Sequence, residues 1–584
     1  MIRSVFGLLN VSQKKSAIKV LILIIVGAVL DIFGLALVLP VLAISSSPED
    51  ISTITELQKL YVFFGFRSTD QFLLIMYISL LLIFIVRALT FLYVKYVISK
   101  FSYGLSRTFS KQLFNVYLYK PLGFFQSNST ADLLRDVYVS TQQFSTYLII
   151  PILQNISELL ILFFVLGGLV LYNVQVFMLL VIVLGPISMM FYWLTKSKME
   201  VIGKEVYSVN GQIINKVSQG IAGYIDVKLS NREQYFVKRF DDDQKYLSKL
   251  NITKSVLMDV FPKMIEFSAI LGIVVIFVYS LLFLKEDQKG MILLLGLFGA
   301  SAYRILPSIS RIMSGMLLIK QYGYLVDIIK IAIEPTNKKI EPTSDLSALE
   351  LKHSVSLRNA KFLYSNESVF NIDIPSFKIA KGEKLGIIGK SGSGKTTLVN
   401  ILLGFYELNS GEIYVDENRL SSKSWPLWKK NFGYVQQNVF VSDVSLKENI
   451  AFGVVENDID DKRVLECVSL ALLDDFVDTL NGGINGILKE NGMNMSGGQR
   501  QRLAIARALY FDRRLLIFDE ATSALDNETE KEVTDSIKSL SNGNITMIII
   551  AHRFSTLKYC DRIIEMEDGK IKCEVEYDDL IQRN

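Results

Sequence analysis

The sequence predicts two parts of different fold class: an α-helical membrane domain with six transmembrane helices, followed by an α/β domain that carries a P-loop. Three observations predict this division. At 584 residues the chain is too long for one hydrophobic core. Half of its residues (50%) are hydrophobic, and the excess lies almost entirely before residue 330. A glycine-rich phosphate-binding motif follows later. We therefore expect a membrane domain over 1–331, a linker over 332–350 and a nucleotide-binding domain over 351–584.

The membrane domain is predicted from apolar runs that are each long enough to cross about 30 Å of hydrocarbon. They lie at 17–44, 71–98, 143–172, 174–195, 256–284 and 290–320. Segment 196–254 is rich in Lys and Arg, whereas the turn at 172–175 carries no charge. By the positive-inside rule segment 196–254 is cytoplasmic, and six spans then place both termini in the cytosol. Several spans are expected to continue as helices beyond the lipid, with cytoplasmic tips near 120–136 and 223–240.

Ionisable residues fall inside or beside these apolar runs, where they are costly unless they are paired or in contact with water. They are Asp31, Arg87, Glu158, Lys263, Glu266 and Arg304. Two interpretations remain open. Ion pairs between helices, such as Asp31 with Arg87, would only hold the bundle together. Alternatively, the cations Arg87, Lys263 and Arg304 would line a water-filled cavity and bind an anionic substrate.

The stretch "KLGIIGKSGSGKTTLV" predicts a buried strand over 384–388, a glycine-rich loop and the start of a helix, and it matches G-x-x-x-x-G-K-[ST]. Backbone amides and the lysine of this loop suit phosphate oxygens, and the hydroxyl of Thr396 can bind magnesium. The residues predicted to bind nucleotide here are Gly389, Ser391, Gly392, Gly394, Lys395, Thr396 and Thr397.

A second nucleotide-related signal is "RRLLIFDEATSALD", in which four apolar residues bring Asp519 and Glu520 to the carboxyl end of a strand. We expect Asp519 to orient magnesium through a water molecule and Glu520 to polarise the water that attacks a γ-phosphate. His552 follows the buried strand "ITMIIIAH", where a γ-phosphate contact is expected. A histidine that only caps this strand is the alternative.

Composition argues against two other classes of function. The net charge is only +4 and the Lys and Arg residues are spread along the chain, so no nucleic-acid partner is expected. Cys467, Cys560 and Cys573 have neither the spacing of a metal site nor that of a disulfide framework, which is typical of a domain in a reducing cytosol.

Taken together, the motifs resemble those of ATP-binding cassette (ABC) ATPases. The segments "GKSGSGKT", "YVQQN", "MSGGQRQRLAIARAL", "LLIFDE", "SALD" and "AH" occur in the order and spacing of that family. With six spans before them, the whole chain resembles an ABC exporter half-transporter. The resemblance implies ATP hydrolysis coupled to transport, with ATP and Mg²⁺ as cofactors.

The resemblance also implies roles for further residues. Gln437 corresponds to the Q-loop glutamine, which senses magnesium and the membrane domain, Asp526 to the D-loop aspartate, and His552 to the switch histidine. Tyr364 lies where the family stacks an aromatic ring on adenine, although Phe362 is close by. The signature motif corresponds to Ser496, Gly497, Gly498 and Gln499.

The sequence departs from the family pattern at two places just before the signature motif. Met495 replaces the usual leucine, and "ILKENGMN" keeps only part of the exporter pattern "TEVGERG". Family architecture places the P-loop of one subunit against the signature motif of the other, with ATP between them. The resemblance therefore implies a homodimer with two competent sites, and a heterodimer with a second half-transporter is the alternative.

Four membrane segments are similar to bacterial flippases for polyprenyl-pyrophosphate-linked oligosaccharides: "DIFGLALVLPVLA", "FIVRALTFLY", "FPKMIE" and "YRILPSISRI". This similarity implies a multi-pass protein of the bacterial inner membrane that moves an amphipathic, anionic, lipid-linked substrate. Arg87, Lys263 and Arg304 would hold the pyrophosphate, with Arg311 as a further candidate. A general lipid, drug or peptide exporter is the alternative, and an ATP-gated channel would be distinguished by its ionic conductance.

Overall fold

The computed structural model describes residues 2–36, 68–172, 174–283, 288–333, 349–364, 371–421, 423–489, 492–520, 530–531, 545–551 and 553–582. The chain divides into two compact units, one formed by 1–120 and 124–337 and the other by 121–123 and 338–584. Residues 334–348 lie outside the described residues, so the predicted limits of the linker stay a prediction.

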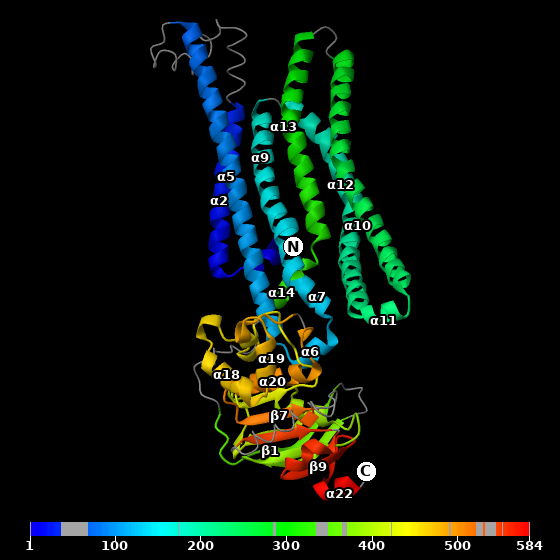
Figure 1. Cartoon of the computed structure of the whole chain (residues 1–584). Helices are drawn as coiled ribbons and strands as arrows, with labels where there is room; N and C mark the ends of the chain where they lie inside the picture. Colours follow the sequence, from blue (N-terminus) through cyan, green and yellow to red (C-terminus); the bar gives the residue numbers. More distant parts are fainter. Residues whose placement is uncertain are drawn as a thin grey trace. The chain divides into compact units, whose positions relative to one another are not determined.

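The first unit is built from long helices that pack side by side (Figure 1). The long helices are α2 (Val11–Ala36), α5 (Thr69–Leu118), α9 (Ile150–Tyr172), α10 (Val174–Ala222), α12 (Glu233–Phe283) and α13 (Gln288–Gln321). Helix α5 has 50 residues and α12 has 51. At a rise of about 1.5 Å per residue, each is roughly 75 Å long, more than twice the thickness of the hydrocarbon layer. As predicted, several of the helices are longer than a bilayer requires.

Short helices connect or flank the long ones. They are α1 (Ile2–Leu8), α6 (Leu122–Ser127), α7 (Thr130–Leu134), α8 (Thr141–Phe144), α11 (Tyr224–Leu229) and α14 (Leu325–Ile333). Two π-helical segments, η2 (Arg135–Ser140) and η3 (Ser145–Ile149), lie between α7 and α9.

Four helical segments of the described chain are long and apolar enough to cross a membrane: 70–118, 130–171, 174–222 and 233–278. They contain or overlap four of the six predicted spans. Helices α2 and α13 coincide with much of the other two, 17–44 and 290–320, but residues 37–44 and the side chains of 279–297 lie outside the described residues. The number of six spans therefore stays a prediction.

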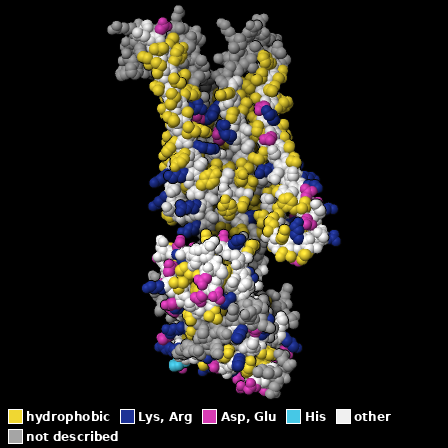
Figure 2. Space-filling model, viewed as in Figure 1, with side chains coloured by type: hydrophobic (Ala, Val, Ile, Leu, Met, Phe, Trp, Pro, Cys, Tyr) yellow, Lys and Arg dark blue, Asp and Glu magenta, His cyan; other side chains and the backbone are white. Residues whose placement is uncertain are grey.

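Hydrophobic side chains cover much of the outer surface of these helices (Figure 2). Leu81 and Leu89 on α5 and Ile182 on α10 are all more than 60% exposed. An apolar surface of this extent is unfavourable in water and suits contact with lipid. The unit nevertheless has its own buried clusters, in which α2, α5, α9 and α14 share one core and α9, α10, α12 and α13 share another.

The second unit contains two sheets. The four-stranded sheet has the order β2-β1-β4-β5 and the six-stranded sheet β10-β9-β3-β8-β7-β6. Their strands are β1 (Ser354–Leu363), β2 (Asn371–Ala380), β3 (Lys384–Ile388), β4 (Ser410–Val415), β5 (Asn418–Arg419), β6 (Phe432–Val435), β7 (Leu515–Asp519), β8 (Thr546–Ile550), β9 (Arg562–Glu567) and β10 (Lys570–Val575). Strands β6, β7, β8, β3 and β9 are parallel. Because β7 and β8 are buried along their whole length, their sequences are almost continuously apolar.

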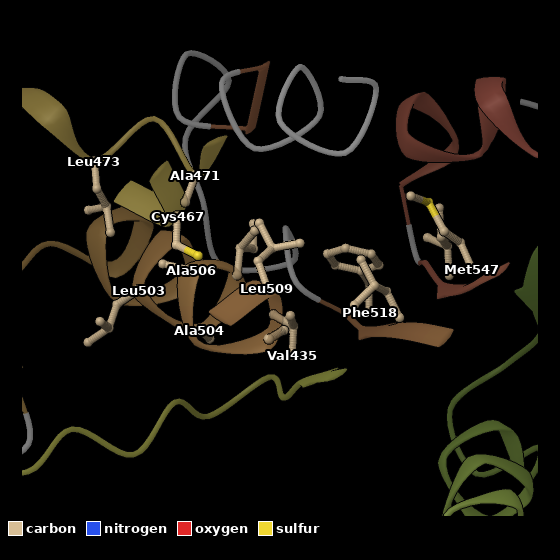
Figure 3. Packing of buried hydrophobic residues seen from close by; sticks show 14 of the residues in the cluster. Val435, Cys467, Ala471, Leu473, Leu503, Ala504, Ala506, Leu509, Phe518 and Met547 are labelled. Carbon is tan, nitrogen blue, oxygen red and sulfur yellow. The ribbon is translucent and has the colours of Figure 1, made fainter. Parts of the chain in front are cut away.

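The helices of this unit are α15 (Lys395–Leu402), α16 (Trp425–Lys429), α17 (Leu446–Ile450), α18 (Asp461–Leu470), α19 (Asp474–Thr479), α20 (Gly497–Tyr510) and α22 (Tyr577–Gln582), with short 3₁₀ turns η5 (Glu456–Asp458), η6 (Gly483–Asn485) and η8 (Phe554–Tyr559). Helix α20 anchors a core shared with the six-stranded sheet. Leu503 and Leu509 of α20 belong to the same buried cluster as Val435, Phe518 and Met547 of the sheet (Figure 3). Each fully buried side chain of this size contributes about 1.5–3 kcal/mol, so the helix is firmly attached.

Candidate functional site

The P-loop joins β3 to α15, and its backbone requires glycine. Gly389, Gly392 and Gly394 all have positive φ angles, of 148°, 81° and 101°. A Cβ atom on Gly389 would lie 2.3 Å from the carbonyl oxygen of Met566. Gly394 also caps the N-terminus of α15, whose first amide groups have no partner within the helix. The loop therefore has the backbone that a phosphate cradle needs.

Lys395 begins α15 and is only 5% exposed. Its Nζ donates hydrogen bonds to the carbonyl oxygens of Gly389 and Lys390, at 2.8 and 3.0 Å. Burial lowers the pKa of the Lys395 ammonium, and the carboxylates of Glu520 and Asp519 oppose that shift. The ammonium is thus held against the loop, where phosphate oxygens can replace the carbonyl acceptors.

Asp519 ends β7 and is 5% exposed. Its Oδ1 accepts from the hydroxyl of Thr396 at 3.5 Å, and its Oδ2 accepts from the hydroxyl of Tyr434 at 2.9 Å. Burial raises the pKa of Asp519, and the hydrogen bond from Tyr434 opposes this effect. A hydroxyl and a carboxylate oxygen side by side are hard oxygen ligands, so Thr396 and Asp519 fit a magnesium ion.

Glu520 follows Asp519 in the left-handed region of φ, at 50°, which is uncommon for a residue other than glycine. Its backbone amide donates to the carbonyl oxygen of Ile550 at 3.0 Å. The side-chain amide of Gln437 donates to Glu520 Oε2 at 2.8 Å. The structure therefore brings together Gln437 and Glu520, two residues that the sequence predicts to be catalytic.

The aromatic position before the P-loop contains Tyr364. Its ring lies 5.1 Å from that of Phe362 and 5.5 Å from that of Tyr406, and its hydroxyl lies 2.6 Å from Thr397 Oγ1. Tyr364 is 50% exposed, whereas Phe362 is 7% exposed. Only Tyr364 thus offers a large exposed ring surface, so the geometry favours it over Phe362 for stacking on adenine.

The signature motif forms the N-terminus of α20. Ser496 caps the helix by accepting from the backbone N–H of Gln499, and Gln499 Oε1 accepts from the backbone N–H of Ser496. This reciprocal capping box leaves Gly497 and Gly498 in the first turn. Met495 is buried in the core that α20 shares with the six-stranded sheet, so its thioether fills the place of the family's leucine.

Two predicted site residues, Asp526 and His552, lie outside the described residues. Two residues that contact the site were not predicted. Tyr434 lies on β6 and reaches Asp519 on the neighbouring strand, and Gln501 on α20 donates to the backbone of Gln437. The segment "YVQQN" contains Tyr434, but only the pairing of β6 with β7 places its hydroxyl at Asp519.

In the first unit, a cavity of about 610 Å³ lies among α2, α5, α9 and α13. Asp31 accepts hydrogen bonds from both Arg87 and Arg304 at its wall. Glu158 accepts from Arg311, at 2.5 and 3.1 Å, and from Ser308 at 2.8 Å. The predicted pairing of Asp31 with Arg87 is therefore present, and Arg304 shares the same carboxylate.

Lys263 is placed differently from the two arginines. Its Nζ pairs with Glu266 on the same helix at 2.9 Å, and its side chain is 76% exposed. It is not among the described residues that line the cavity. The structure thus brings Arg87 and Arg304 together at Asp31 and leaves Lys263 outside this group.

The cavity wall carries an excess of positive charge. Four lining residues are basic and two are acidic, a difference of +2. The basic residues are Arg87, Lys95, Arg304 and Arg311, and the acidic ones are Asp31 and Glu158. The side chains of Asp31, Arg87 and Arg304 are about one-fifth exposed or less, so their charges are only partly screened by water.

Comparison with known proteins gives two matching family models. The model described as "ABC transporter" matches residues 372–523, and the model described as "ABC transporter transmembrane region" matches residues 16–298.

Relatives and a solved structure match over most of the chain. The ATP-dependent lipid A-core flippase of Paraburkholderia xenovorans (strain LB400) is 30% identical over 477 residues, covering 79% of this chain and 76% of the relative. The protein of the same name from Escherichia coli (strain K12) is 27% identical over 529 residues, covering 89% and 88%. The structure of a bacterial Atm1-family ABC exporter with ATP bound matches with a TM-score of 0.76 at 18% identity, covering 98% of this chain and 97% of that one. At this identity the structural match shows the fold alone.

Proposed function

The chain belongs to the ABC transporter family, and from that premise we propose that it is an exporter that flips an anionic, lipid-linked substrate across the bacterial inner membrane. Its fold is that of an ABC exporter, with a helical transmembrane domain before an α/β ATPase domain that couples ATP hydrolysis to transport. A polyprenyl-pyrophosphate-linked oligosaccharide is our leading candidate for the substrate. The observation that carries this proposal is the positively charged cavity of the membrane unit.

The residues of the ATPase site have complementary roles in the proposed mechanism. The P-loop amides and Lys395 bind the β- and γ-phosphates. Thr396, Asp519 and Gln437 would hold a magnesium ion, which neutralises phosphate charge when it is bound. Glu520 accepts a proton from the attacking water as the water oxygen bonds to the γ-phosphorus and the bond to the ADP oxygen breaks. The hydrogen bond from Gln437 keeps the Glu520 carboxylate in position for this transfer.

We assign the signature motif at the N-terminus of α20 to the ATP bound by a second copy of the chain. A single copy carries a P-loop and a signature motif, so a twofold dimer would form two equal sites. The γ-phosphate would join the nucleotide-binding domains in a way that ADP cannot, and this difference in binding energy would shift the membrane domains between two states. The cytoplasmic tips near 123–130 and 224–232 are the proposed couplings. A heterodimer with a second half-transporter is the alternative.

The cavity suits a molecule with an anionic part and an apolar part. Arg87 and Arg304 face Asp31, while Phe84, Phe91 and Leu92 line the same space. Arginine can bind pyrophosphate oxygens in a bidentate manner, and the aromatic and aliphatic side chains would lie along a lipid chain. Arg311, paired with Glu158, would add a further cation, whereas a role for Lys263 requires that it move away from Glu266.

A lipid A-core molecule is the second candidate for the substrate. The matching relatives are named ATP-dependent lipid A-core flippases, which favours a lipid of this kind. A general lipid, drug or peptide exporter is the broader alternative, since cavities of this type need only an apolar wall and a few polar groups.

Reconstitution in proteoliposomes tests the proposal. Labelled polyprenyl-pyrophosphate oligosaccharide, lipid A-core, a zwitterionic phospholipid and a cationic drug would each be assayed for ATP-dependent translocation, with Glu520→Gln protein as the control. We expect the pyrophosphate-linked oligosaccharide to move. Movement of lipid A-core alone would replace the leading candidate with the second one, and movement of only the zwitterionic or cationic molecules would overturn the proposal of an anionic substrate.

A further inference from the structure

Helix α20 contacts the Q-loop of its own chain through a buried glutamine. Gln501 lies early in α20 and is 7% exposed. Its Nε2 donates hydrogen bonds to the carbonyl oxygens of Gln437, at 2.9 Å, and Gln436, at 3.3 Å. One side-chain amide thus fixes two successive peptide groups of the Q-loop.

A second side chain of the same helix fixes the Q-loop further along. The guanidinium of Arg507 donates to the carbonyl oxygen of Phe440 at 2.9 Å. Helix α20 is itself held by the core, in which Leu503 and Leu509 are buried (Figure 3). The segment 436–440 is therefore attached at both ends to a firmly packed helix.

The fixed peptide groups support a catalytic contact. Gln437 receives the hydrogen bond from Gln501 on its backbone, and its side chain donates to Glu520 Oε2 at 2.8 Å. A shift of the Gln437 backbone would move its side chain relative to the Glu520 carboxylate. Misplacement of a catalytic group by about 1 Å can cost a large part of the rate.

We propose that Gln501 is a positioning residue for ATP hydrolysis, which holds the Q-loop of its own chain so that Gln437 meets Glu520. In the proposed dimer, the signature motif at the start of the same helix contacts the ATP bound by the partner. Gln501 then connects the two ATP sites within one chain.

Two roles for Gln501 can be separated in a dimer. If Gln501 acts through the Q-loop, its loss affects the site that contains Glu520 of the same chain. If Gln501 only supports α20, its loss affects the signature motif and hence the site of the partner chain. The first outcome supports the proposal and the second contradicts it.

The variant Gln501→Leu removes the donor and keeps a similar volume. Tyr510→Phe is the matched control, because it removes one hydrogen bond, from the backbone N–H of Asp460 at 3.1 Å, at the other end of α20. When every chain carries the substitution (the uniform protein), we expect Gln501→Leu to lower kcat by about 3- to 10-fold, with little change in KM for ATP. This loss corresponds to one hydrogen bond to a positioned group. Tyr510→Phe should leave both constants within about twofold of wild type.

Gln501→Lys is the second variant, because a lysine keeps donors for the two carbonyl oxygens. We expect it to retain more of kcat than Gln501→Leu, measured on samples whose thermal unfolding matches that of wild type. If Gln501→Leu does not fold, Gln501→Lys and Gln501→Glu replace it in the comparison. The glutamate places oxygens against the carbonyls, so its kcat should fall well below that of the lysine variant, and equal values would overturn the proposal.

Differently tagged chains allow mixed dimers with one working catalytic glutamate. The reference pairs a wild-type chain with a Glu520→Gln chain. We expect Gln501→Leu to lower kcat by about 3- to 10-fold when it is placed in the chain with the intact Glu520, and to have little effect when placed in the Glu520→Gln chain. A defect only in the second arrangement, or in neither, would overturn the proposal.

The mixed-dimer experiment also distinguishes failure of the proposed role of Gln501 from failure of the proposed dimeric assembly. If no mixed dimer can be isolated, the proposed assembly fails, and the kinetics of the uniform Gln501→Leu and Tyr510→Phe proteins still decide the role of Gln501. An unchanged kcat, or a rise in KM alone, would then contradict it. None of these measurements depends on which lipid is transported.

Discussion

The nucleotide site and the membrane cavity hold their charges in different ways. In the nucleotide site, charged groups are fixed by the backbone and by neutral side chains: Lys395 bonds to two carbonyl oxygens and Asp519 accepts from two hydroxyl groups. In the cavity, the charged groups hold one another, since Asp31 is shared by Arg87 and Arg304.

This difference indicates how each region binds its ligand. A site fixed by backbone geometry suits one chemical shape, and such geometry requires particular residues such as Gly389. We propose that the paired charges of the cavity exchange the carboxylate of Asp31 for a ligand anion, which would let the cavity accept varied anionic molecules. A local sequence motif therefore predicts the nucleotide site. The charge arrangement of the cavity depends on which helices pack together.

The largest expected effect is that of Glu520→Gln, which tests the nucleotide site, where the backbone and neutral side chains fix the charged groups. The substituted amide can still accept the hydrogen bond from Gln437, but it cannot accept a proton from water. We expect kcat for ATP hydrolysis to fall by at least about 100-fold, the usual contribution of a general base, while ATP binding is retained. Nucleotide binding and hydrolysis would be measured on the same purified sample.

Glu466→Gln is the control for Glu520→Gln. Glu466 is a carboxylate of the same unit that pairs with Arg463 at 2.9 Å and is 61% exposed. Exposed ion pairs contribute less than about 1 kcal/mol to stability, so Glu466→Gln should leave the fold intact. Its kcat should therefore change by less than about twofold. Full ATPase activity of Glu520→Gln would contradict its role as the base.

The same difference between the regions explains what the sequence could predict. The P-loop, its strand and its helix are contiguous, so their pattern predicts both the fold and the residues that bind phosphate. Tyr434 and Gln501 reach the site through strand pairing and helix packing, which no local pattern records. Arg304 meets Asp31 across 273 positions of sequence, so its pairing required the packed bundle.

The second prediction concerns the exchangeable charges of the cavity. We expect the triple variant Arg87→Gln, Asp31→Asn, Arg304→Gln to lose at least about 10-fold in transport of an anionic lipid while keeping basal ATPase activity within about twofold. Removing the whole cluster avoids leaving one buried charge without its partner, which would destabilise the protein. Transport and ATPase activity would be measured in the same proteoliposomes.

The pair Lys263→Gln, Glu266→Gln is the matched control for the triple variant. It removes an ion pair of the same type from α12, outside the described cavity lining, and should leave transport nearly unchanged. An equal loss of transport in this variant would instead support the sequence prediction that Lys263 binds the substrate. Unchanged transport in the triple variant would show that the cations of the cavity do not bind cargo.

The third prediction separates pairing from substrate binding with Asp31→Asn alone. If Asp31 competes with the substrate anion for Arg87 and Arg304, its neutralisation should lower the half-saturating lipid concentration by about 3- to 10-fold, because one charge-assisted contact no longer has to be broken. Lipid-stimulated ATPase activity would report the concentration. Asp31→Asn leaves two arginines without their carboxylate and should lower the thermal unfolding temperature in either case. An unchanged half-saturating concentration would therefore be the result that assigns the ion pairs to holding the helices together only.

The smallest expected effect is that of Tyr434→Phe, which returns to the fixed site. The Tyr434 hydroxyl donates to Asp519 Oδ2 while Oδ1 faces Thr396, so Tyr434 restricts how the carboxylate can turn toward a magnesium ion. Losing one neutral hydrogen bond should raise the Mg²⁺ concentration needed for half-maximal ATP hydrolysis by about 2- to 5-fold, with kcat at saturating Mg²⁺ nearly unchanged. Tyr414→Phe, which removes a hydrogen bond to Glu412 on β4, is the control and should shift neither value. If Tyr434→Phe left the Mg²⁺ dependence unchanged, Asp519 would be oriented by the backbone of β7 and by Thr396 alone. The hydroxyl of Tyr434 would then have no part in holding the Asp519 carboxylate.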